Sequence, residues 1–217
     1  MNWWKRLLRS VWPSSAGANT PSAGPNIPGW RIAEARDHWM VWRDADGDVL
    51  SLAVQAKSLQ NDLPSLSDED AVRRYCRGLA ESGGAGLVEA TTTASSHGPA
   101  IRLIYKKLTI PAFQFTGMLI MPMPNATCIW TTVAGEHGTT GIREAVITAE
   151  LMNQGKLTVE SYQASWAQDP YDSAYCGVVR CTLRYFSVVV CFDPLFPQHP
   201  LSMVRQELRT LASVEID

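Results

Sequence analysis

The sequence lacks most of the short motifs that identify a binding or catalytic site. It contains no Cys-x-x-Cys pair, no Gly-x-Gly-x-x-Gly loop and no Gly-Lys-Ser/Thr turn. A zinc ribbon, a dinucleotide-binding fingerprint and a P-loop are therefore excluded. No cofactor and no metal is predicted, and function has to be inferred from the organisation of the chain.

A disulfide framework is also missing. The five cysteines are an odd number in a chain of ordinary size, and their spacing does not repeat. Cys176 and Cys181 have four residues between them, but no neighbouring Cys or His completes a tetrahedral zinc site. Free thiols indicate a reducing compartment, so a cytoplasmic location is predicted.

Charge is scarce, at 18% of the residues, and the net charge is −2. A nucleic-acid-binding protein needs a basic surface that neutralises several phosphates, so this class is excluded as a general function. The hydrophobic content, 46% of 217 residues, is enough for one domain with a substantial core and too high for a disordered chain.

The basic residues are concentrated at the N-terminus. Residues 1–13 contain an apolar stripe at helical spacing with three bases beside it, and the residues involved are Trp3, Trp4, Lys5, Arg6, Leu7, Leu8, Arg9 and Trp12. Pro13 ends the pattern. The segment is too short to span a bilayer and lacks the cleavage site of a secretory signal. We expect a helix that contacts an anionic membrane surface or a protein partner, or else one that folds back on its own domain or frays.

Residues 14–29 carry no charge and no periodicity, and their Ser, Gly and Pro content predicts a flexible linker. A single domain is expected over residues 30–217. Its first part reads as strands at 30–43 and 49–56, paired across Asp46-Gly47. The acidic run around this turn lacks the glutamate that a calcium loop needs at its twelfth position, so a turn is favoured.

A helix follows, predicted to be capped by Ser67 and to stop at Gly83-Gly84. Its three arginines, Arg73, Arg74 and Arg77, are assigned to a solvated face, with an anionic partner as the alternative. Strands are then expected at 86–93, 100–109, 113–123 and 126–134. Their short connections predict an antiparallel meander. In the second of them, the alternation places Lys106 toward solvent.

The last part of the chain is predicted to add helices. Residues 139–153 show helical spacing with Thr139 as N-cap and with five apolar residues directed inward: Ile142, Ala145, Val146, Ala149 and Met152. The tyrosine-rich segment after this helix is either a partner interface or a loop pinned over the core. A strand is expected at 181–191 and a closing helix from Pro200, burying Val204, Leu208 and Leu211. The fold class is therefore α+β, with a central antiparallel sheet covered by helices.

One corner of the sequence gathers several chemically capable groups. Gly135 to Gly141 joins a strand to a helix, and its candidate residues are Glu136, His137, Gly138, Thr139 and Thr140. Free amides at a helix N-terminus favour an anion, and Glu136 with His137 could supply acid and base. No nucleophile is fixed beside His137 by spacing, so a turn, a binding site and a catalytic site all remain possible readings.

The order of the elements over residues 30–216 resembles the PsbP-like α+β sandwich family, whose members include a photosynthetic extrinsic subunit and a nuclear-transport factor. The resemblance implies a binding or accessory protein without enzymatic activity and transfers no site residue to this chain. We therefore expect a non-catalytic interaction or accessory module with a protein partner, tethered through its N-terminal segment. A small hydrolase or transferase using Glu136 and His137 is the alternative.

Overall fold

The structure is a computed structural model that describes residues 27–36, 39–45, 47–56, 63–110, 112–165, 168–177 and 185–216. The predicted N-terminal helix and most of the predicted linker lie outside the described residues. The description begins at Ile27, whose side chain is 7% exposed and belongs to the core.

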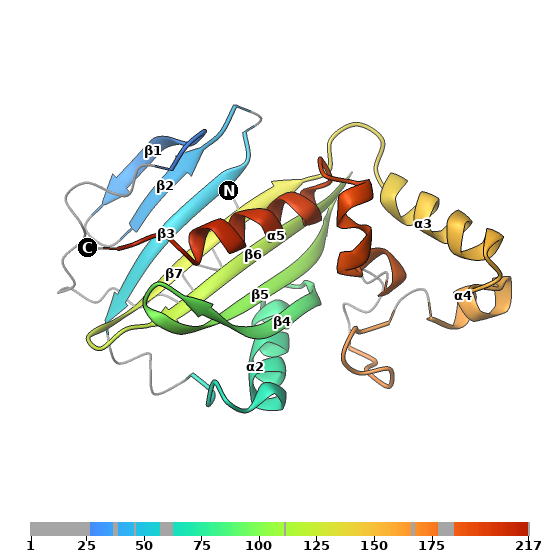
Figure 1. Cartoon of the computed structure of the whole chain (residues 1–217), viewed down its shortest axis with the longest axis horizontal. Helices are drawn as coiled ribbons and strands as arrows, with labels where there is room; N and C mark the ends of the chain where they lie inside the picture. The colour runs from blue at the N-terminus through green and yellow to red at the C-terminus, as the bar shows by residue number, and fades with distance from the viewer. Residues whose placement is uncertain are drawn as a thin grey trace.

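A seven-stranded antiparallel sheet forms the body, with strand order β1-β2-β3-β7-β6-β5-β4 (Figure 1). The strands are β1 (Arg31–Arg36), β2 (Trp39–Arg43), β3 (Val49–Ala56), β4 (Gly86–Ser95), β5 (Gly98–Thr109), β6 (Ala112–Pro122) and β7 (Ala126–Gly135). Two meanders, β1 to β3 and β4 to β7, join where β3 pairs with β7. The predicted α+β class and antiparallel meander are confirmed. The predicted turn before β3 is present, because Arg43 pairs with Val49 across it.

Helices cover both faces of the sheet. They are α2 (Glu69–Ser82), α3 (Ile142–Asn153), α4 (Val159–Ser165) and α5 (Pro200–Leu211), with 3₁₀ turns η3 (Tyr185–Val188) and η4 (Val190–Leu195) before α5. In Figure 1, α5 lies along one face and α2 against the other at the β4 edge, while α3 and α4 project beyond the end of the sheet.

The α5 face holds the larger core. Val204, Leu208 and Leu211 of α5 are buried as predicted. They pack over a layer that includes Trp42 and Trp130, whose ring centroids are 5.5 Å apart. The α2 face has a second core that includes Val72, Cys76 and Ala80 from the predicted apolar side of that helix.

The N-terminus of α2 lies one residue later than predicted. Asp68 is the N-cap, because its carboxylate accepts a hydrogen bond from the backbone N–H of Ala71 at 2.9 Å. The hydroxyl of Ser67 instead pairs with that of Ser65. Both side chains suit an N-cap, and the carboxylate adds a favourable interaction with the helix dipole.

The prediction that Lys106 faces solvent is wrong, since its side chain is 0% exposed. It assumed a strand with one solvated face, as many antiparallel sheets have. Here β5 is covered on both sides: Ile101 and Leu103 belong to the α2 core, and Ala100 and Ile104 belong to the α5 core. At Lys106 the strand therefore has no face that meets water.

The tyrosine-rich segment is bound to α2. The carboxylate of Asp169 is 1% exposed and accepts hydrogen bonds from Arg77 at 3.0 and 3.3 Å. The hydroxyl of Tyr171 accepts from the N–H of Ala90 at 2.8 Å, and the guanidinium of Arg73 lies 4.8 Å from its ring centroid. These contacts hold the tyrosine-rich segment in place as a loop over the core.

The predicted strand at 181–191 is wrong where the structure describes it. Residues 185–188 and 190–195 form 3₁₀ turns, and residues 181–184 lie outside the described part of the chain. The β-branched run that suggested a strand instead leaves Val190 half exposed, in a connection that leads into α5.

Candidate functional site

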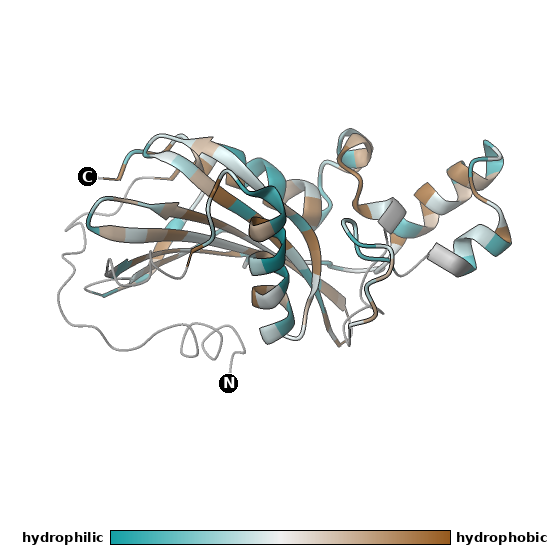
Figure 2. Ribbon diagram, turned by 90° about the horizontal axis from the view of Figure 1, so that it is seen from below, coloured by the Kyte–Doolittle hydropathy of each residue, from teal (hydrophilic) through white to brown (hydrophobic). Residues whose placement is uncertain are grey.

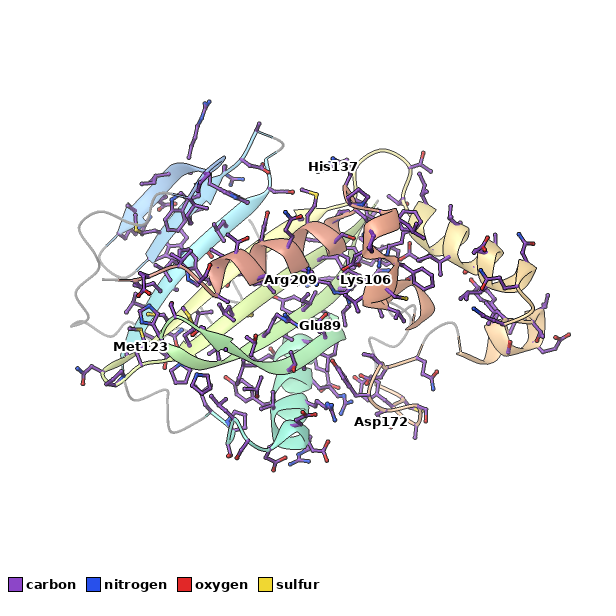
Figure 3. All side chains as sticks on the ribbon, viewed as in Figure 1. Glu89, Lys106, Met123, His137, Asp172 and Arg209 are labelled. Atoms are coloured by element: carbon purple, nitrogen blue, oxygen red, sulfur yellow. The ribbon has the colours of Figure 1, made fainter. Side chains whose placement is uncertain are left out.

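The glycine-rich corner separates the two residues that were paired in the sequence-based hypothesis. Glu136 turns its carboxylate inward, with its side chain 5% exposed. His137 is exposed on the loop between β7 and α3 (Figure 3), whereas Lys106 is buried in β5. Gly138 and both threonines of the corner, Thr139 and Thr140, are exposed as well.

The helix after this corner starts later than predicted. Its N-cap is Gly141, not Thr139, and the first helical residue is Ile142. Gly141 has a φ of 76°, a left-handed conformation that glycine adopts without steric cost. The N–H of Gly141 donates to Oε1 of Glu136 at 3.3 Å. The chain thus supplies an anion of its own at this end of α3.

Glu136 is joined to His199, a residue that the sequence-based hypothesis omitted. Nε2 of His199 lies 3.3 Å from Oε1 of Glu136, and Nδ1 accepts a hydrogen bond from the N–H of Leu201 at 3.1 Å. Because Nδ1 is the acceptor, the proton of the neutral ring is on Nε2, which donates to the carboxylate. His199 is therefore the N-cap of α5, and both of its ring nitrogens are engaged.

Next to this pair is an ion pair between Lys106 and Glu144, with Nζ 2.6 Å from Oε1. The ammonium also lies 3.9 Å from the ring centroid of Phe113, close enough for a cation–π interaction. Burial acts to raise the pKa of Glu144, but the charge and hydrogen bond of Lys106 outweigh it and hold the pKa below its usual value. Glu144 is therefore ionised at neutral pH.

Three of these residues could offer ligands to a metal ion. One donor atom from each of Glu136, Glu144 and His199 lies within 4.8 Å of the others. Carboxylates and imidazole suit Zn²⁺ and similar ions. However, the ammonium of Lys106 is bound to Oε1 of Glu144 and would repel a metal ion at the other oxygen, and Nε2 of His199 could bind an ion only if Nδ1 gave up its capping hydrogen bond. The arrangement is better suited to holding β5, β7, α3 and α5 together.

A second polar cluster anchors α3 to the connection before α5. Arg143 is 1% exposed and donates to the carbonyl of Ser187 at 2.7 Å, to Oγ of Ser202 at 2.9 Å and to Asp193 at 2.8 Å. Arg205 shares the same oxygen of Asp193 at 2.9 Å. The side of α3 that meets the rest of the protein is thus fixed largely by charged hydrogen bonds.

The opposite side of α3 is apolar and exposed. We call Ile142, Ala145, Val146 and Ala149 the α3 apolar face. Ile142 is 51% exposed and Val146 is 48% exposed, and Figure 2 shows hydrophobic residues along the projecting helix. The prediction that these residues are buried is wrong. The inward side of the helix carries Arg143 and Glu144 together with the buried Ile147, whereas the α3 apolar face is left exposed and is a candidate binding surface.

Comparisons with known proteins do not identify the chain. No family model matches it, and no curated protein matches it. One solved structure that it resembles comes from Bacteroides thetaiotaomicron VPI-5482, with 12% identity and a TM-score of 0.29 over 51% of this chain. The match spans 37% of that protein's length and carries no argument about function.

Three residues of the buried cluster were missed from sequence: Lys106, Glu144 and His199. Only His199 carried a usable signal, because it directly precedes Pro200, the predicted first residue of the closing helix. The candidate membrane-contact residues, from Trp3 to Trp12, lie outside the described residues. Among the residues that are described, no helix has both the length and the apolar composition needed to cross a bilayer.

Proposed function

We propose that this protein is a non-catalytic interaction or accessory module that binds a protein partner through the α3 apolar face. The observation that supports the proposal is the exposure of Ile142 and Val146 on α3, a helix held to the rest of the protein through Arg143 and Ile147 on its other side. These two aliphatic side chains lie one helical turn apart and are about half exposed to water. A partner that buries them would remove apolar surface from water, which favours binding. An apolar helix face of this kind fits the side of another helix.

An acidic residue at the border of the α3 apolar face indicates which kind of surface could bind there. Glu150 is exposed one residue after Ala149, so an acid flanks the apolar strip. An anionic lipid surface would repel this acid, whereas a protein surface with an apolar centre and basic rim would complement it. The partner is therefore a protein, and the N-terminal segment is the part of the chain proposed to contact a membrane.

That N-terminal contact would be peripheral and reversible. Three bases contribute about 1 kcal/mol each near an anionic leaflet, and the tryptophans favour the interfacial region. The hydrolase or transferase alternative requires Glu136 and His137 to act together. Their separation in the structure, with Glu136 bonded to His199, gives it no support.

The test compares Val146→Glu with Ile110→Glu. Ile110 is 92% exposed in the turn after β5, so it is a matched aliphatic control away from α3. Both substitutions should leave the free energy of unfolding within about 0.5 kcal/mol of wild type, because both sites are exposed. In extracts of cells that naturally contain the protein, size-exclusion chromatography should show the wild type and Ile110→Glu in a larger complex and Val146→Glu as the free chain.

Equal elution of all three proteins would contradict the proposal. So would light scattering on the purified chain that shows self-association through this face, because the occupant would then be a second copy and not a partner protein.

A further inference from the structure

A cavity of about 340 Å³ lies between α5 and the described start of the chain, on the side of the molecule away from α3. Cavities of this size accept small organic molecules. Its apolar wall includes Ile27, Trp30, Leu50 and Leu211, of which Leu50 and Leu211 are almost fully buried. Glu207 of α5 supplies a carboxylate to this otherwise mainly apolar lining.

Two further carboxylates act on the charge of Glu207. Its carboxylate accepts a hydrogen bond from the hydroxyl of Thr132, a buried residue of β7. The charged groups that act on it are Asp44 and Asp48, both from the turn between β2 and β3. The segment 27–30 contributes no titratable group. Glu207 is therefore the carboxylate of the cavity lining, and two more carboxylates are near enough to act on its charge.

This environment disfavours the ionised form of Glu207. Burial is the main cause and the two aspartates add to it, and together they raise the pKa of Glu207 to about 7. A cation in the cavity would reverse the balance, because it would compensate the carboxylate charge at short range in a partly dry site. An apolar body on the same molecule would fill the remaining volume.

We infer that this cavity binds a small organic cation, a primary ammonium carried on an aromatic or alkyl body, with the ammonium at the carboxylate of Glu207. The apolar body would pack against Leu50 and the indole of Trp30. A guest that is apolar and neutral would leave the carboxylate of Glu207 without a counter-charge, and an anionic guest would be repelled by it. The inference is independent of the α3 apolar face.

Isothermal titration calorimetry on the full chain tests the inference, with phenethylammonium as the probe and 2-phenylethanol as its neutral counterpart. We expect the ammonium to bind at least about tenfold more tightly than the alcohol, as a charge-assisted hydrogen bond predicts. Glu207→Gln keeps the shape of the side chain and should reduce binding of the ammonium by a similar factor. Glu160→Gln removes the same charge from α4 and should leave binding unchanged.

Two further readouts do not depend on Glu207→Gln being folded. Affinity for the ammonium should rise between about pH 6 and about pH 8, and binding near neutral pH should release a proton, seen as a dependence of the heat on the buffer. Trp30→Leu should weaken binding of phenethylammonium. Equal affinity for the ammonium and the alcohol would overturn the inference, and so would ammonium binding that is independent of pH.

Discussion

At the scale of single residues, the buried charges are the most consequential feature of this protein. Lys106 is 0% exposed and its partner Glu144 is 14% exposed. A pair of this kind often adds little net stability, but removal of one member leaves the other charge buried without compensation. Substitution of one member of the pair should therefore lower the free energy of unfolding much more than substitution of both.

We predict that Lys106→Met lowers the free energy of unfolding by about 3 to 5 kcal/mol, because it strands the carboxylate of Glu144. Urea denaturation measures the change. The double variant Lys106→Met with Glu144→Gln removes both charges and should recover at least half of the loss. A double variant as unstable as the single one would show that packing, not the ion pair, sets the cost.

A second residue-scale prediction concerns pH. The pKa of Glu207 rises from 4.5 to about 7 in the folded protein. The folded state therefore holds this proton more tightly than the unfolded state, and the associated stability is present below about pH 4.5 and lost as the pH rises through about 7. Relative to Glu207→Gln, the wild type should lose at most about 3 kcal/mol over that window.

Urea denaturation of both proteins at several pH values measures this difference. A gap between wild type and Glu207→Gln that stays constant from acid to mildly alkaline pH would show that the carboxyl titrates normally.

At the scale of elements, the contact between α5 and β6 is the tightest constraint. A Cβ atom added at Gly117 would lie 2.5 Å from Cγ1 of Val204 and 2.8 Å from Cδ1 of Leu208. The absence of a side chain at Gly117 therefore allows α5 to pack closely against β6. This close approach also fixes the depth at which α5 carries Arg205 and Glu207.

Gly117→Ala should accordingly lower the free energy of unfolding by about 1 to 3 kcal/mol, the usual cost of overpacking a core. Gly135→Ala is the matched control, since a Cβ atom at Gly135 in the neighbouring strand has no atom within 4 Å. Thermal denaturation of the two variants should differ clearly. Similar melting temperatures would mean that α5 can shift without cost.

Periodicity predicts the elements of this chain well where burial is ordinary and fails where it is not. The strands 86–95 and 126–135, and the helix from Pro200, lie where their patterns predicted them. The pattern of α3 is just as regular, yet Ile142 and Val146 lie outside. Sequence periodicity predicts that a helix has an apolar and a polar side, but it does not predict which side packs against the rest of the protein.

The site shows the same limit. Glu136 is singled out by its place after a strand, but its partner His199 lies 63 residues later and the pairing depends on how α5 is placed on the sheet. Lys106 was assigned to solvent because alternation assumes one wet face. Long-range pairing and two-sided burial are properties of the assembled sheet, so neither is available from a local window.

At the scale of the whole molecule, two contacts are proposed: the α3 apolar face binds a protein, and residues 1–13 bind a membrane surface. Deletion of residues 1–13 should leave the unfolding transition unchanged and abolish sedimentation with vesicles that contain phosphatidylserine, because the three bases and the tryptophans are removed together. Vesicles of phosphatidylcholine alone are the control and should bind neither protein strongly. Equal sedimentation of both proteins with the anionic vesicles would contradict a tether at residues 1–13.

The central claim is that the α3 apolar face is bound by another protein. Its most direct test is a photo-crosslinking amino acid placed at Val146 or at Ile110 in the full chain, expressed in the cells that naturally contain it. The account predicts one discrete protein adduct from position 146, no matching adduct from position 110, and loss of the adduct when Ile142→Glu is added. No adduct at 146, or the same adducts from both positions, would contradict it.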